Sequence, residues 1–188
     1  MEFKLMIGGN RMFRKRKFIF LTMISIILLS ACGKSLDERA IAGVEAARVA
    51  FQMNDKGLTE EVASIKLYKP AGFTMNESSD AQNIVFTKND ETFILFINPN
   101  EKSDSKLFYD LLLADKSKEI IEQATFSDEG TFGFAAVVKS GEDNVELIVS
   151  VGGSKITTMT KKKKIEENLA KMMEIVRSIQ QSPNTSAE

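Results

Sequence analysis

The side chains of this chain that could carry out chemistry are carboxylates, lysines, serines and two tyrosines. The 188 residues include no histidine. An imidazole general base, a Ser-His-Asp triad and an imidazole zinc site are therefore excluded. The closest match to a catalytic motif is Ser103-Asp104-Ser105-Lys106, but the S-D-N and K-T-G motifs that accompany S-x-x-K in acyl-transfer enzymes are missing. The position favours a helix cap at Ser103 or Asp104, and the sequence predicts no catalytic residue.

Acidic pairs and a glycine turn are the other candidate binding motifs. Asp128-Glu129 and Glu142-Asp143 could offer oxygen ligands to calcium, but they lack the spacing of a calcium loop and fall in predicted turns. Residues 151–155 contain two glycines without the phosphate-loop pattern, which is typical of a turn between strands. We therefore expect neither a metal nor a cofactor.

Four consecutive lysines, Lys161, Lys162, Lys163 and Lys164, stand near the start of the last predicted helix. Cations at this end of a helix oppose its dipole. A solvated charged edge would account for the run without a function. The alternative is contact with anionic lipid headgroups, a wall polymer or an acidic partner, to which each lysine would contribute about 1 kcal/mol. These lysines are the candidate anion or partner contact.

The single cysteine, Cys32, follows a segment with the layout of a secretory signal. The uncharged apolar stretch Phe18 to Ala31 precedes it, and a basic patch precedes that stretch: Arg11, Arg14, Lys15, Arg16 and Lys17. The apolar stretch is shorter than the about 20 residues that span a bilayer. Translation could start at Met1 or at Met12, which opens a more compact signal.

The residues Leu29-Ser30-Ala31-Cys32 resemble the lipobox of bacterial lipoproteins. The resemblance implies cleavage before Cys32 and a diacylglyceryl group on its thiol, which is then no longer a nucleophile. Two acyl chains anchor a protein stably, so the expected location is the extracytoplasmic face of the cell membrane. Nineteen lysines against six arginines, and no tryptophan, fit a low-GC Gram-positive bacterium.

The mature chain has the size and charge of one acidic domain. Removing residues 1–31 takes away six basic residues and one acidic residue, which leaves 157 residues with 19 basic and 25 acidic ones, a net charge of −6. This balance argues against nucleic acid as a partner. We expect a signal peptide over 1–31, a lipidated cysteine, tether and helix over 32–57, an α+β domain over 58–181, and a disordered tail over 182–188.

Helical and strand periodicities predict the elements of that domain. Helices are predicted from Ser35, which has capping-box spacing with Glu38, to about Gly57, and over 105–114 and 162–181. Strands are predicted over 65–68, 83–88, 92–98, 120–126, 131–139, 145–151 and 156–160. Hairpin turns between them favour a meander. The predicted fold class is α+β, an antiparallel sheet of about six to seven strands packed with helices.

Two expectations concern how the helices pack. The strand over 92–97 is apolar on both faces, so something should cover the second face of the sheet, at least in part. The helices over 105–114 and 162–181 are available for this. The first helix could pack on the domain or serve as a stalk.

The order of elements from Ile65 to Ile179, with the run Tyr68-Lys69-Pro70-x-Gly72-Phe73, is similar to the PsbP-like fold. Members of that family are mostly non-catalytic subunits or assembly factors of membrane complexes. The resemblance implies a partner-binding module and supplies no cofactor-site residues.

Three functions stay open at this point. The favoured one is a non-enzymatic lipoprotein that acts as a protein-interaction or assembly module. The second is a cell-surface protein that binds a small ligand or an anionic polymer. A small-ligand site would be a pocket ringed by the aromatic residues Tyr68, Phe73, Phe93, Phe108 and Phe126. The third is a carboxylate hydrolase, which needs two acids facing each other across a cleft.

Overall fold

The computed structural model describes residues 34–53 and 56–181. The predicted signal, Cys32 and the tail after residue 181 lie outside the described residues. Within the described part of the chain, no helix combines the length and the apolar character needed to cross a membrane.

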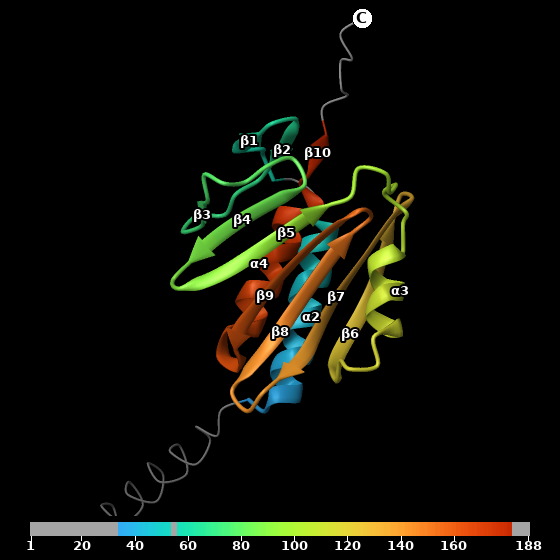
Figure 1. The fold of residues 1–188 in the computed structure, drawn as a ribbon. Coiled ribbons are helices and arrows are strands. Elements are labelled where there is room, and N and C mark those ends of the chain that lie inside the picture. Colours follow the sequence, from blue (N-terminus) through green and yellow to red (C-terminus); the bar gives the residue numbers. More distant parts are fainter. Residues whose placement is uncertain (1–33, 54–55, 182–188) are drawn as a thin grey trace, which may run out of the picture. The chain divides into compact units, whose positions relative to one another are not determined.

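The fold is α+β, as predicted, and its main sheet contains seven antiparallel strands (Figure 1). Their order across the sheet is β3-β4-β5-β9-β8-β7-β6. The strands are β3 (Thr74–Met75), β4 (Asn83–Lys88), β5 (Glu91–Ile97), β6 (Ile120–Asp128), β7 (Thr131–Ser140), β8 (Asn144–Val151) and β9 (Ser154–Lys161). Six of the predicted strands lie in this sheet.

The connection between the strands is not one meander, so that prediction is wrong. Strands β3 to β5 form one run of hairpins and β6 to β9 form another, and the two runs join where β9 pairs with β5. The reason is the segment after β5, which carries the chain to the far edge of the sheet through helix α3 (Leu107–Ala114). The turn between β4 and β5 is a two-residue loop, with Asn89 and Asp90 both at positive φ, as a type I′ hairpin requires.

Three helices cover the two faces of the sheet unequally (Figure 1). Helices α2 (Leu36–Gln52) and α4 (Ile165–Arg177) pack together on one face, called the inner face below, whereas α3 lies on the outer face. Ser35 and Glu38 form the predicted capping box at the start of α2. Because α2 shares its core with α4 and the sheet, it is part of the domain and not a stalk.

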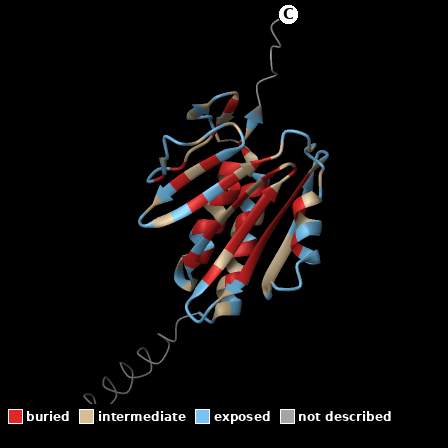
Figure 2. Ribbon diagram, in the orientation of Figure 1, coloured by how far each residue is buried: buried red, intermediate tan, exposed pale blue. Residues whose placement is uncertain are grey.

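The main core lies between the inner face and the two helices. Alternate residues of β5 and β8 point into it, including Phe93, Leu95, Leu147 and Val149, all fully buried. A smaller core on the outer face joins Phe108 and Leu112 of α3 to side chains of β7 and β8: Phe132, Phe134, Ala136, Val138 and Ile148. Figure 2 shows the contrast between the strongly buried β7 and β8 and the more exposed β4 and β5.

A second, three-stranded sheet joins β1 (Glu60–Val62), β2 (Ile65–Leu67) and β10 (Gln180–Gln181). The predicted strand over 65–68 belongs to this sheet. The last helix, predicted over 162–181, is shorter than predicted at both ends. A 3-10 turn, η1 (Lys162–Lys164), precedes α4, and α4 ends at Arg177. The Ser178 hydroxyl donates to the Ile175 carbonyl (2.7 Å) and accepts from the Tyr68 amide (2.8 Å), which turns the chain from the helix toward β2.

Candidate functional site

The outer face of the sheet is only partly covered, and its uncovered part is the candidate site. Outward-pointing side chains of β5 and β9 meet there: Thr92 and Ile94 on one strand, Thr157 and Met159 on the other. Ile94 and Met159 are each 50% exposed. These four residues, together with Glu146 of β8 opposite Met159, are called the open face below.

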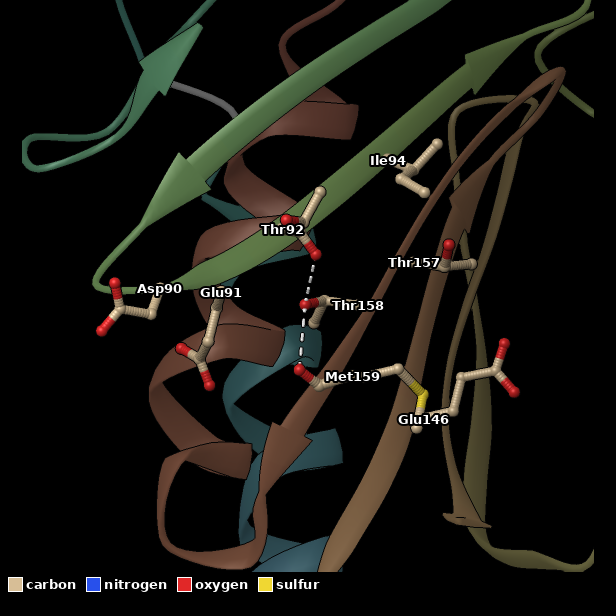
Figure 3. A pocket seen from close by; sticks show the side chains of 8 residues that line it. All are labelled: Asp90, Glu91, Thr92, Ile94, Glu146, Thr157, Thr158 and Met159. Atoms are coloured by element: carbon tan, nitrogen blue, oxygen red, sulfur yellow. Dashed lines mark hydrogen bonds between the residues drawn. The ribbon is translucent and has the colours of Figure 1, made fainter. Parts of the chain in front are cut away.

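The open face is hollowed (Figure 3). A depression of about 350 Å³ is lined by its five residues and by Asp90, Glu91 and Thr158. A second hollow of about 180 Å³ lies between α3 and the sheet and shares Glu146 and Thr157 with the first. The two hollows therefore form one surface, which extends to Leu111 on α3, itself 55% exposed.

Charged groups sit at the border between the open face and α3. Glu146 forms an ion pair with Lys118. The Lys155 ammonium lies 5.0 Å from the ring centre of Phe108. Burial lowers the pKa of Lys155, the charge of Glu146 opposes that effect, and the charge of Lys118 adds to it. These contacts hold the side chains at the border between the open face and α3 in place.

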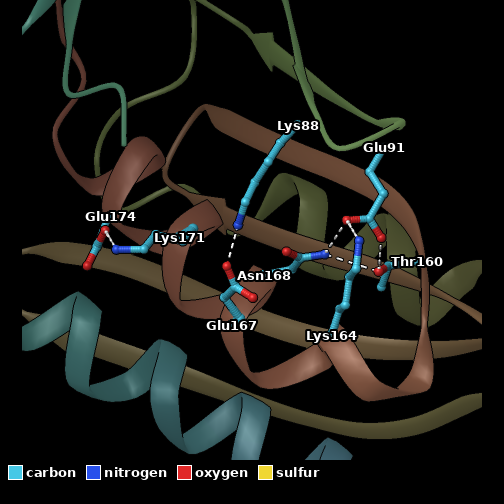
Figure 4. Close-up of polar contacts among 8 residues, drawn as sticks. All are labelled: Lys88, Glu91, Thr160, Lys164, Glu167, Asn168, Lys171 and Glu174. Carbon is cyan, nitrogen blue, oxygen red and sulfur yellow. Dashed lines mark hydrogen bonds and ion pairs between the residues drawn. The ribbon is translucent and has the colours of Figure 1, made fainter. Parts of the chain in front are cut away.

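A cluster of polar side chains lies at the end of the open face that is farther from α3, on the inner side of the first residue of β5 (Figure 4). The Glu91 carboxylate accepts hydrogen bonds from the Thr160 hydroxyl, from Lys164 Nζ (3.0 Å) and from Asn168 Nδ2 (3.4 Å). Burial acts to raise the pKa of Glu91, but the three hydrogen bonds and the charge of Lys164 outweigh it, so the pKa lies below its usual value. The cluster ties the β4–β5 turn to α4.

The four predicted lysines do not act alike. Lys164 is bound within the domain by Glu91. Lys161 and Lys163 are exposed and Lys162 is partly exposed, and among the described residues none of the three has an ion-pair partner. Lys161, Lys163 and Lys164 line a further hollow of about 370 Å³, which borders the open face through Asp90, Glu91 and Met159.

The prediction that Ser103 or Asp104 caps the helix over 105–114 is wrong. Ser103 and Asp104 do not cap α3, because the helix begins at Leu107 and Ser105 Oγ accepts from the Leu107 amide (3.2 Å). Ser103 instead donates to the Gly130 carbonyl (3.2 Å), and Lys106 lies over the Phe132 ring. The two ends of the S-x-x-K motif are therefore not on one helix.

The predicted aromatic pocket is not formed. Phe73, Phe93 and Phe126 are buried in the core of the inner face, whereas Phe108 belongs to the core of the outer face. Aromatic side chains on opposite faces of a sheet cannot line one pocket.

Two alternatives that depend on acidic side chains, a pair of catalytic carboxylates and a cation site, can be compared with the positions of these residues. Glu91 and Glu146 both line the depression, but the Glu91 side chain points inward to Thr160 and Lys164, whereas Glu146 lies outward beside Met159. Asp128 pairs with Arg177 at 3.4 Å. In the described part of the chain, no group of three or more Asp, Glu or Cys side chains could hold a metal ion.

The residues that sequence reasoning missed are Ile94, Met159 and Leu111. The signal for Ile94 was present in the apolar outer side of the strand over 92–97, which was interpreted as covered. Seven strands about 4.8 Å apart span about 29 Å, whereas a helix about 10 Å across covers about two strands. Once two helices pack on the inner face, the remaining one is too small to cover the outer face.

The comparisons with known proteins find similarity to solved structures only. No family model matches the sequence, and no curated protein matches it. Among solved structures, the fold is similar to the solution structure of cyanobacterial PsbP (CyanoP) from Synechocystis sp. PCC 6803. The identity is 15% over 66% of this chain and 92% of that chain, with a TM-score of 0.40. A PsbP protein is thus a structural neighbour of this chain.

Proposed function

We propose that this chain is an extracytoplasmic lipoprotein, held at the cell membrane by diacylglyceryl Cys32, that acts as a non-enzymatic protein-interaction module. The observation that carries the proposal is the open face. Ile94 and Met159 are diagonal neighbours and half exposed, beside the part of the outer face that α3 covers over β7 and β8. Exposed apolar side chains that adjoin one another on a sheet are candidates for contact with a partner.

The chemistry of the open face defines the partner. Among the described residues that line its depression, the charged ones are acidic: Asp90, Glu91 and Glu146. Glu91 and Glu146 already have cationic partners, which leaves Asp90 at the margin as the acid that a partner can reach. The complementary surface has an apolar centre and a basic residue at its rim. We assign it to another protein of the same membrane surface.

The expected contribution of the two apolar side chains sets the size of the effect to be measured. Full burial of an Ile or Met side chain contributes about 1.5–3 kcal/mol, so burying the exposed half of each contributes about 1 kcal/mol. Together they correspond to roughly a thirtyfold change in affinity.

The anchor is tested separately from the partner. Cells that express the tagged chain are fed a clickable palmitate analogue, and the purified protein is examined for label. We expect label on the parent and none on Cys32→Ala. An unlabelled parent protein in the membrane fraction would overturn the lipoprotein part of the proposal.

The partner is tested by cross-linking in intact membranes and recovery through a C-terminal tag. We expect one protein at constant stoichiometry, lost from the double variant Ile94→Asp/Met159→Asp. The matched control is Val49→Asp, which changes a similarly exposed residue (46%) on α2, away from the outer face. Equal recovery from all three proteins would remove the open face from the proposal.

A further inference from the structure

The two helices of the inner face run in the same direction, so their first turns lie at the same end of the domain (Figure 1). Near that end, Gly43 of α2 faces Ile165 and Leu169 of α4 so closely that an added Cβ would come within 2.6 and 2.9 Å of them. At the other end, Arg177 Nε donates to the Phe51 carbonyl at 3.3 Å. The lysines before α4 therefore share one end of the domain with Ser35.

Ser35 is three residues from Cys32 in the sequence. A fully extended chain spans at most about 3.6 Å per residue, so the three residues that link Cys32 to Ser35 can span no more than about 11 Å. If Cys32 carries the lipid anchor, the end of the domain that bears the lysines is the end held nearest to the membrane.

The positions of the lysines are unfavourable for helix stability. Lys162, Lys163 and Lys164 occupy the turn that leads into α4, where the helix dipole favours anions. The residue at the N-cap is Lys164, which makes no side-chain cap hydrogen bond. Lys164 is held by Glu91, but Lys161, Lys162 and Lys163 have no comparable contact among the described residues. Neither ion pairing nor helix stability within the domain therefore explains why these three positions carry lysines.

We propose that Lys161, Lys162 and Lys163 bind the anionic headgroups of the membrane that carries the anchor, and so hold the domain end-on to the bilayer. This inference rests on the proposed lipid anchor. In this orientation the sheet stands on its end, and the open face is directed sideways, toward proteins in or on the same membrane. The lysine surface and the open face adjoin at Asp90 and Met159, so one orientation serves both contacts.

Acidic side chains share this end and would oppose the contact. Glu167 is paired with Lys88, and Glu38 bonds within the capping box of α2. Glu142 and Asp143 lie in the turn before Asn144, which pairs with Lys161 across β8 and β9. Replacing these two acids with Gln and Asn should strengthen binding to an anionic surface.

The test measures how accessible each lysine is when the mature protein is bound to vesicles. The lipoprotein is added to preformed vesicles of phosphatidylcholine alone, or with 30 mol% phosphatidylglycerol, and exposed amines are acetylated with a membrane-impermeant reagent. We expect labelling of Lys161, Lys162 and Lys163 to fall severalfold on the anionic vesicles and to recover in high salt. Lys66, Lys69 and Lys102, near the opposite end, are internal controls and should not change. Equal labelling on both vesicle types overturns the proposal.

Variants provide the second measurement. In sedimentation with anionic vesicles, the Cys32→Ser protein should lose tenfold or more of its partition when Lys161, Lys162 and Lys163 are changed to Gln. The control, Lys66→Gln/Lys69→Gln/Lys102→Gln, makes the same change in net charge at the other end and should bind as the parent does. Equal losses in both variants overturn the proposal, as does tighter binding to soluble poly(glycerol phosphate) than to vesicles at equal phosphate concentration.

These results remain separable from those on the anchor. If acyl labelling of Cys32 fails in cells, coupling the single cysteine to a maleimide lipid still tests the lysine contact. Protection of the lysines in that coupled protein supports the contact even where the natural anchor is absent, and unprotected lysines reject it.

Discussion

At the scale of single residues, Glu91 joins the first residue of β5 to the start of α4. Its carboxylate is 12% exposed and accepts three hydrogen bonds, one of them charge-assisted from Lys164. Removing the charge in Glu91→Gln should lower the free energy of unfolding by about 1–3 kcal/mol at pH 7, because the Lys164 ammonium loses its counter-ion. Urea unfolding measures this. The control Glu61→Gln, in an exposed ion pair, should change stability by less than about 0.5 kcal/mol.

The effect of Glu91 should depend on pH. Its pKa is lower in the folded chain than the usual value of about 4.3, so the unfolded chain binds more protons between those two values. The stabilisation is present above about pH 4.3 and is lost as the pH falls through the folded pKa. The difference between the parent and Glu91→Gln should therefore shrink between pH 5 and pH 2. A difference that grows in acid would contradict the proposed role of the carboxylate.

Gly43 provides the second prediction at this scale. Alanine is favoured over glycine in a helix by about 1 kcal/mol, but a Cβ at this position would come 2.6 Å from Ile165 Cγ2. Overpacking of a core costs about 1–3 kcal/mol, so Gly43→Ala should be destabilising on balance. The control is Gly57→Ala, where an added Cβ meets no atom within 4 Å and should leave stability unchanged or raised. A Gly43→Ala protein as stable as the parent would mean that α2 and α4 can separate without cost.

At the scale of elements, the turn before α4 should reveal whether its lysines serve the fold. Changing Lys161, Lys162 and Lys163 to Gln removes three cations from the positive end of a helix dipole. We expect the melting temperature to stay the same or to rise slightly. A loss of more than about 1 kcal/mol in unfolding free energy would show that these lysines are structural, and the membrane role would lose its main argument.

The same scale shows what the sequence could and could not predict. Local signals were sufficient for the capping box at Ser35 and for the strand over 83–88, which begins and ends as predicted. The pairing of β5 with β9 could not be predicted, because it joins residues about 60 positions apart and depends on which edge of the sheet the chain reaches after α3. The last helix was predicted too long because β10 pairs with β2, a tertiary contact that overrides local helical periodicity.

The candidate site was predictable only in part. The lysine run is visible in the sequence, but its division into Lys164, bound to Glu91, and three outward cations depends on tertiary packing. The open face requires the knowledge that a single helix is left for the outer side of the sheet. Ile94 and Met159 are far apart in the sequence and become neighbours only through the register of β5 and β9.

At the scale of the whole molecule, the open face should matter for binding and not for folding. Ile94→Ser/Met159→Ser removes side chains that are half exposed, so the free energy of unfolding should fall by no more than about 1 kcal/mol. Affinity for the partner should fall by roughly thirtyfold. Circular dichroism melts and titration with the recovered partner measure the two quantities. If the double variant is strongly destabilised but its folded molecules still bind the partner with normal affinity, Ile94 and Met159 belong to the core and not to the binding surface.

The most direct test of the central claim is site-specific photo-cross-linking in the native membrane. A photoreactive amino acid replaces Ile94 in one protein and Val49 in another, and adducts are compared after irradiation. We expect position 94 to give one dominant protein adduct, abolished by Met159→Asp, and position 49 to give none of it. Identical adducts from both positions, or an adduct at position 94 that persists in the Met159→Asp protein, would contradict the claim that the open face binds a protein partner.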